Sequence, residues 1–272
     1  MLINGKLPKL GKKAPVIDSR TLKLSNYLKP TPTFSPPPPA LAPAPPEASW
    51  ITKLEAAEKI PMYLNDVLGT CVPAAAGHMI QQWSFYAGHP WQPTDEDILL
   101  AYESVAGYIP GQPQTDQGCD ILSFLKYWQK TGLGGHKILG YTSVDYLDLE
   151  EVQIAIELFG NVFTGLQLPL FVQGANLWTV PDGGIYSDEG QPGGWGGHCV
   201  PTPAGSPITK TCETWGTVLK MSNNFHHDYV DEAYAVLSPD WLETGNVSPS
   251  LLDLEQLEAD LNELGVLSRK IT

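Results

Sequence analysis

A cysteine at the predicted start of an apolar helix is the side chain in this sequence best suited to nucleophilic chemistry. Cys71 ends the segment Asn65-Asp66-Val67-Leu68-Gly69-Thr70-Cys71, and an apolar run follows it as far as Trp83. A thiol attacks as the thiolate, and a helix N-terminus favours that anion and lowers the thiol pKa. Most lone cysteines are small buried apolar residues, so a catalytic Cys71 requires a base and an orienting group elsewhere in the chain.

His198 is the candidate for that base. It follows Gly193-Gly194-Trp195-Gly196-Gly197, where glycines allow the backbone to approach a ligand closely. Glu213 comes fifteen residues later. If 198–201 and 211–221 are adjacent strands, His198 and Glu213 share one face of the sheet. The carboxylate would then hold the imidazole, and the sequence predicts a Cys71, His198 and Glu213 triad.

The same register has a consequence for the cysteines. Cys199 and Cys212 would be cross-strand neighbours on the opposite face, as a pair of buried thiols or, less favourably, as a disulfide. The chain has four cysteines and no C-x-x-C pair, so we expect no structural zinc site and no cofactor.

The elements that must position these residues follow from periodicity and capping residues. We expect helices at 70–87, 94–105, 121–130, 149–159 and 251–264, and strands at 162–168, 198–201, 211–221 and 233–237. Because helices precede strands, the fold class is α+β, with one helical and one sheet lobe. His78 lies two turns after Cys71, too far to act as its base, and we expect it to be partly exposed.

Charge is distributed unevenly along the chain of 272 residues. Residues 1–46 hold seven basic residues and one acid, a net charge of +6, so the rest carries −20 of the total of −14. The acidic body argues against nucleic acid as a ligand. A basic arm could fold back on that body, bind another acidic surface or remain a solvated tail.

The domain organisation follows from composition. We expect a basic arm at 1–29, a proline-rich linker at 30–47, a globular domain at 48–247 and a C-terminal amphipathic helix and tail at 248–272. Residues 30–46 contain nine prolines, which indicate an extended polyproline-type spacer. No apolar run is long enough for a membrane span and no signal peptide is recognised, so we expect a cytoplasmic or virion-associated protein.

The order and separation of the candidate residues resemble those of papain-like cysteine peptidases. The histidine lies 127 residues and the polar orienter 142 residues after the cysteine. The resemblance covers roughly 49–240, and its other motifs are Ala48-Ser49-Trp50, Gln117-Gly118-Cys119-Asp120 and Glu213-Thr214-Trp215-Gly216. It implies a two-lobed fold and acyl transfer on a peptide or amide substrate. The tetrahedral oxyanion would be bound by the Asn65 amide and the Cys71 N–H.

The departures from that family are specific. Asn65 stands where the family has glutamine, Glu213 stands where it has asparagine, and Thr70-Cys71-Val72 replaces Ser-Cys-Trp. The usual disulfide partners are missing, and the N-terminal arm is too short and irregular to be the family's helical propeptide. We expect the cleft to be lined by Gly69, Trp178, Trp195, Gly197 and Trp215. Core packing would explain Trp178 and Trp195 equally well.

The whole chain also resembles proteins encoded by tailed bacteriophages and prophages. The shared segments are Leu10-Gly11-Lys12-Lys13-Ala14-Pro15, the Asn65 to Cys71 stretch, and Glu232 to Trp241. This resemblance keeps two function classes open. One is a cysteine hydrolase. The other is a capsid or tail component of a phage particle that keeps the fold and is anchored to a structural protein through residues 1–46.

Overall fold

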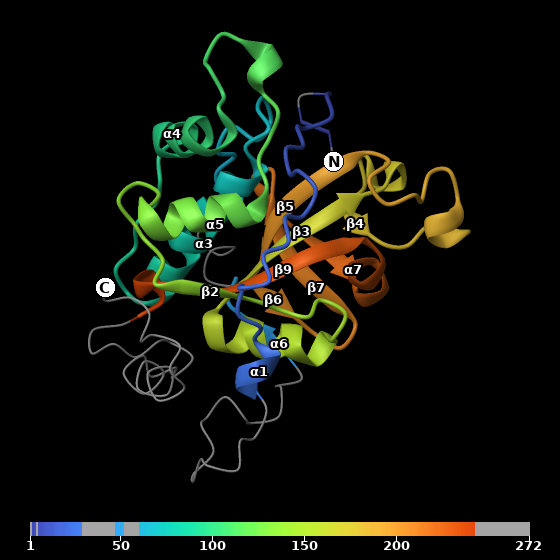
Figure 1. Cartoon of the computed structure of the whole chain (residues 1–272). Coiled ribbons are helices and arrows are strands. Elements are labelled where there is room, and N and C mark those ends of the chain that lie inside the picture. The colour runs from blue at the N-terminus through green and yellow to red at the C-terminus, as the bar shows by residue number, and fades with distance from the viewer. Residues whose placement is uncertain (1, 4, 29–46, 52–59, 243–272) are drawn as a thin grey trace.

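The computed structural model describes residues 2–3, 5–28, 47–51 and 60–242. Residues 30–46 of the predicted linker and the predicted helix at 251–264 lie outside these ranges. Figure 1 shows the helices between residues 71 and 130 gathered on one side of the molecule and most of the strands on the other, with the remaining labelled helices below or beside the strands. Within the described residues, no helix is both long enough and apolar enough to pass through a membrane.

The helical half is built around α3 (Cys71–Tyr86), with α4 (Asp95–Ala106) and α5 (Ile121–Lys130) packed against it. Fourteen of the sixteen residues of α3 are buried, so the helix is enclosed on all sides rather than along the single stripe that the periodicity predicts. Thr94 and Asp120 cap α4 and α5 by accepting hydrogen bonds from Asp97 N and Ser123 N. The predicted helices of this half are confirmed to within one or two residues.

The other half holds two sheets. The first is four-stranded in the order β2 (Gly140–Ser143), β9 (Val230–Leu237), β3 (Val162–Leu168) and β5 (Gly196–Thr202). The second is five-stranded in the order β1 (Ala48–Ser49), β6 (Ala204–Gly205), β7 (Thr209–Thr214), β8 (Thr217–Ser222) and β4 (Leu177–Trp178). Three further helices complete the described fold: α1 (Ser25–Leu28), α6 (Leu149–Phe159) and α7 (Asn223–Tyr229).

Two sheet predictions are wrong. The predicted strand 211–221 is interrupted by a tight turn at Trp215 and Gly216, both with positive φ, so β7 folds back onto β8. β5 pairs with β3 in the other sheet. Cys199 and Cys212 therefore belong to different hydrophobic cores and are not cross-strand neighbours, and all four cysteines are free thiols.

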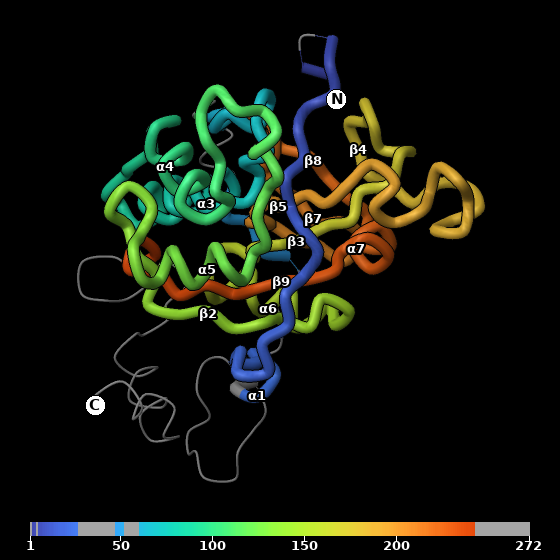
Figure 2. Tube along the Cα trace, turned by 45° about the horizontal axis from the view of Figure 1, so that its top comes forward, coloured from blue at the N-terminus to red at the C-terminus, as the bar shows by residue number. Residues whose placement is uncertain are grey.

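The N-terminal segment has an unexpected position. Figure 2 shows it running between the helical half and the strand half before it reaches α1. Hydrogen bonds to both halves hold it there: Lys12 N donates to Gly197 O at 3.1 Å, and Cys119 N donates to Gly11 O at 2.9 Å. The basic arm thus folds back on the acidic body, one of the three arrangements that the charge distribution allowed.

Candidate active site

Cys71 is the first residue of α3 and is 1% exposed. The turn before it is fixed by Thr70, whose hydroxyl donates to Tyr63 O at 3.0 Å. Burial raises the pKa of the Cys71 thiol to about 11, although hydrogen bonds with the backbone of Cys199, Gly11 and Val72 oppose that rise. The thiol pKa is therefore raised in this state, because burial outweighs these backbone hydrogen bonds, the one at the start of the helix included.

His198 lies on β5 and is completely buried. Its ring stacks on Trp215 with ring centroids 4.4 Å apart and planes 17° apart, and its Nε2 lies 2.7 Å from Thr214 Oγ1. Its Nδ1 has no hydrogen-bond partner among the described residues. Burial lowers the pKa of His198 to about 3, so the imidazole is neutral in this environment. The ring is therefore held by a hydrogen bond at Nε2, and Nδ1 makes none with the described residues.

Glu213 was predicted to hold that imidazole, but Thr214, the next residue, bonds to Nε2 instead. β5 and β7 belong to different sheets, so the side-by-side pairing that the prediction assumed does not exist. Glu213 is 1% exposed, and its Oε2 lies 3.5 Å from Nδ1 of His78. His78 is 2% exposed, so the expectation that it is partly exposed is wrong, and burial lowers its pKa to about 3.

Residues 9–13, which we call the cleft segment, cover the thiol. Besides the two hydrogen bonds given above, Lys13 N donates to Cys119 O at 3.0 Å and Lys9 N donates to Asn65 O at 3.3 Å. The backbone of Gly11 is hydrogen-bonded to the Cys71 sulfur. The remaining space beside the thiol is a cavity of about 10 Å³, room for a single water molecule at most.

Glycines allow the cleft segment to approach this closely. A Cβ at Gly11 would lie 2.6 Å from Gly69 Cα and would overlap the Gly69 carbonyl. A Cβ at Gly118 would overlap the Gly11 carbonyl, and one at Gly197 would overlap the Lys12 carbonyl. Four glycines from distant parts of the chain therefore meet where backbone packs directly on backbone.

Asn65 is 3% exposed and lies in the loop that precedes α3. Tyr63 and Leu64, just before it, have φ values of 52° and 63°, a left-handed conformation that non-glycine residues seldom adopt. The Asn65 amide donates to Lys9 O at 3.4 Å and to Leu68 O at 3.3 Å, and Trp215 Nε1 donates to the same Lys9 O at 3.3 Å. A carbonyl of the cleft segment thus accepts a hydrogen bond from the Asn65 amide, one of the two donors that we assigned to an oxyanion.

The structure places the five residues that were predicted to line the cleft in three different ways. Gly69, Gly197 and Trp215 contact the cleft segment. Trp195 is partly buried and packs on Trp215 with ring centroids 5.5 Å apart. Trp178 is completely buried behind His198 and Trp215, so its assignment to the cleft surface is wrong.

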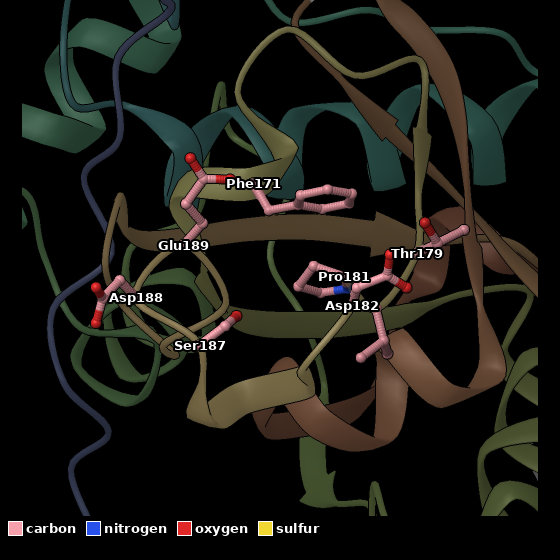
Figure 3. A pocket seen from close by; sticks show the side chains of 8 residues that line it. Phe171, Thr179, Pro181, Asp182, Ser187, Asp188 and Glu189 are labelled. Carbon is pink, nitrogen blue, oxygen red and sulfur yellow. The ribbon is translucent and has the colours of Figure 1, made fainter.

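A second hollow of about 470 Å³ opens elsewhere on the surface (Figure 3). Its lining residues are Phe171, Thr179, Val180, Pro181, Asp182, Ser187, Asp188 and Glu189. It shares no residue with the cavity at Cys71, and its lining includes neither a cysteine nor a histidine. The side chains suited to nucleophilic catalysis are therefore at the cleft segment and not at this hollow.

Comparison with solved structures identifies the architecture. Xylellain, a cysteine protease from Xylella fastidiosa, superposes with a TM-score of 0.61 at 14% identity, covering 85% of this chain and 97% of that one. The fold is papain-like. The Amb a 11 cysteine protease, a ragweed pollen allergen in its proform, gives a TM-score of 0.51 at 14% identity over 86% of this chain and 65% of that one. Procathepsin L 3 of Tenebrio molitor larval midgut gives 0.51 at 12% identity, over 84% and 75%.

At these identities the papain-like fold is what the similarity establishes. No protein-family model matches the chain, and no curated protein matches it in sequence. The two-lobed α+β class predicted from the sequence is confirmed. The candidate site must therefore be argued from its own geometry.

Sequence reasoning missed the contacts made by Gly11, Lys12, Cys119 and Thr214. The signal for the cleft segment was present as the Leu10-Gly11-Lys12-Lys13 motif, in which a glycine and two lysines precede a strongly acidic body. Thr214 adjoins the predicted orienter, and only the turn at Trp215 decides which of the two neighbours faces the imidazole.

Proposed function

We propose that this chain is a papain-like cysteine hydrolase that cleaves peptide or amide bonds and is held in a latent state by its own cleft segment. The observation that carries the proposal is the cleft itself. It already binds an extended peptide through backbone hydrogen bonds, directly over a cysteine at a helix N-terminus. Such bonds do not depend on side chains, so another peptide could use the same groups.

The proposed chemistry uses groups on both sides of the cleft. Thr214 Oγ1 accepts the Nε2 proton of His198, which leaves Nδ1 free to take the Cys71 proton when substrate replaces the cleft segment. The thiolate adds to the carbonyl carbon, and the Asn65 amide and the Cys71 N–H bind the oxyanion. His198 then returns the proton to the leaving amine, and water hydrolyses the thioester and regenerates the thiol.

Latency follows from what the cleft segment presents to the thiol. The Cys71 sulfur is hydrogen-bonded to the Gly11 backbone, and the Gly11 carbonyl oxygen is bonded to Cys119 N. Because the Gly11 carbonyl oxygen already accepts the hydrogen bond from Cys119 N, it is not available to the oxyanion donors. Burial by the segment also keeps the thiol protonated. Two of the solved structures with this fold are described as proforms, which agrees with a latent state.

The test is hydrolysis by the full-length chain after the cleft segment has been loosened. The Gly11→Ala chain, which cannot seat the segment, should cleave members of a fluorogenic peptide panel that the unmodified chain leaves intact. Adding Cys71→Ser should abolish cleavage. If Cys71 of Gly11→Ala is alkylated readily by iodoacetamide but no peptide is cleaved, the hydrolase proposal is wrong. That outcome would favour a structural component of a phage particle, which stays a prediction, as does phage origin.

A further inference from the structure

Lys12 fills a built pocket one residue away from the point where the cleft segment meets the thiol. Its side chain has no exposed surface, and its ammonium lies 2.9 Å from Asp231 Oδ2 and 3.0 Å from Glu232 Oε1. Gly165 makes room for the stem, since a Cβ there would overlap Lys12 Cε and lie 2.7 Å from Glu232 Cγ. We call this space, lined by Gly165, Gln167, Asp231 and Glu232, the acidic pocket.

A bulge in the sheet brings the two acids together. Gly165 of β3 pairs with Glu232 of β9, but the next residue, Leu166, pairs with Val230, so Asp231 is an extra residue in β9. Neighbouring residues in a regular strand point to opposite faces, and a bulge changes that direction. The irregularity lets the consecutive acids Asp231 and Glu232 both reach one ammonium ion.

The remaining polar groups hold the acids in place. Gln167 Nε2 donates to Asp231 Oδ2 at 2.6 Å, and Tyr234 OH donates to Glu232 Oε2 at 3.1 Å. Burial alone would lower the pKa of Lys12, but Glu232 and Asp231 together raise it. Burial raises the pKa of Glu232, and Lys12 opposes that rise. Two carboxylates, of which Glu232 is 6% exposed, are therefore arranged for a cation.

We infer that the acidic pocket is a specificity pocket, which selects peptide substrates carrying a lysine or another long basic side chain beside the reactive position. This inference rests on the proposed hydrolase function. The Cys119 backbone bonds to Gly11 O and Lys13 N on either side of Lys12, and Gly197 O accepts from Lys12 N, so a substrate held by the same backbone groups would place one side chain in this pocket. An apolar side chain of equal length would leave the buried Glu232 and the partly buried Asp231 without this counter-ion.

Binding can be tested without turnover in the full-length Lys12→Ala chain, which vacates the pocket. Lys13→Ala is the matched control, because Lys13 is adjacent and exposed. Iodoacetamide should label Cys71 faster in Lys12→Ala than in Lys13→Ala. A synthetic peptide of residues 5–18 should then protect Cys71. Replacing lysine 12 of the peptide by norleucine should raise the half-protecting concentration at least about 30-fold, since it breaks a buried ion pair. Norleucine at position 13 should change it less than about twofold.

The pocket acids are tested by Asp231→Asn in the Lys12→Ala background. It should weaken protection by the native peptide and leave protection by the norleucine-12 peptide nearly unchanged. Of the two peptide side chains, only lysine carries the ammonium that pairs with the Asp231 carboxylate. The inference is overturned if the two peptides protect equally, or if Cys71 is labelled no faster in Lys12→Ala than in the control.

Turnover gives an independent reading. Fluorogenic peptides with lysine at the first or second residue before the cleaved bond should have a kcat/KM at least about tenfold higher than peptides with norleucine at the same position. No preference at either place overturns the substrate inference. Protection that discriminates lysine, together with no hydrolysis of any peptide, would refute the hydrolase function and leave the acidic pocket as the anchor of the cleft segment alone.

Discussion

The contact between Gly11 and Gly69 offers a direct way to open the cleft by a single methyl group. Gly11→Ala would place a Cβ 2.6 Å from Gly69 Cα, whereas carbon atoms in contact are separated by roughly 3.5–4.0 Å. The neighbour is backbone and cannot turn aside as a side chain would. Gly11 does not have the left-handed φ of a turn glycine, so alanine brings no strain of its own. The cleft segment must therefore shift by about 1 Å or leave.

The size of the effect follows from the hydrogen bonds that such a shift would break. Three backbone bonds join residues 11–13 to the rest of the domain, at 2.9, 3.0 and 3.1 Å. At about 1 kcal/mol net for each bond, their loss weakens binding of the segment by about 3 kcal/mol. That free energy corresponds to a roughly 100-fold larger population in which Cys71 is uncovered. Iodoacetamide should therefore label Cys71 roughly 100-fold faster in Gly11→Ala.

The assay is the rate of carbamidomethylation at each cysteine of the native full-length chain, resolved by peptide mass spectrometry. Cys212 is completely buried in the other hydrophobic core and reports general unfolding within the same sample. Gly140→Ala is the control for a harmless glycine substitution, because Gly140 does not have a left-handed φ and its Cβ would meet nothing within 4 Å. An unchanged rate at Cys71, or an equal rise at Cys71 and Cys212, would refute the argument that the segment alone covers the thiol.

Two further predictions concern the buried histidines. In the Gly11→Ala background, Thr214→Val should lower peptide hydrolysis about tenfold or more while Thr214→Ser retains it, because Val leaves the buried Nε2 of His198 unpaired; kcat and its pH profile are the measurements. Burial lowers the pKa of His226 to about 3, so the unfolded chain binds more protons between about pH 3 and 6.5 and stability falls as pH drops through that window. From pH 7 to pH 5 this histidine costs about 2 kcal/mol of the free energy of unfolding. In urea unfolding, His226→Leu should therefore lose less stability over this pH range than the unmodified chain. The control His227→Gln, at the exposed neighbour, should lose as much as the unmodified chain.

The sequence was sufficient for the elements that short-range patterns determine. Helix 121–130 is observed at those residues, because its apolar spacing, its Asp120 cap and the Thr131-Gly132 end all agree. Strand 162–168 is likewise found as predicted. The predicted strand 211–221 failed because its alternation continues through Trp215, and nothing in the pattern of residue types marks the positive φ there. Short strands such as β1, β4 and β6 have too few residues to carry a periodic signal.

The site was predictable only in part, since its decisive contacts join residues far apart in sequence. The order of Cys71, His198 and Asn65 could be read from motif spacing, and the structure places Cys71 beside the strand that carries His198. The cleft segment is extended and irregular, so no periodic pattern of residue types predicts it. Its partners lie about 60 to 190 residues further along the chain, as Gly69 and Gly197 show. Without a template, sequence patterns do not specify such non-local contacts.

The charge distribution acquires a meaning once these contacts are known. Lys12 reaches Asp231 and Glu232, Lys9 Nζ lies 3.8 Å from Asp116 Oδ2, and Gly69 N donates to the other oxygen of the same Asp116. The basic arm therefore meets the acids of the body at the cleft. The Lys12 side chain is fully buried, whereas the Lys9 side chain is 56% exposed, so salt should weaken the Lys9 pair far more than the Lys12 pairs. Raised ionic strength alone should consequently leave Cys71 covered, whereas loss of the one buried ammonium should uncover it.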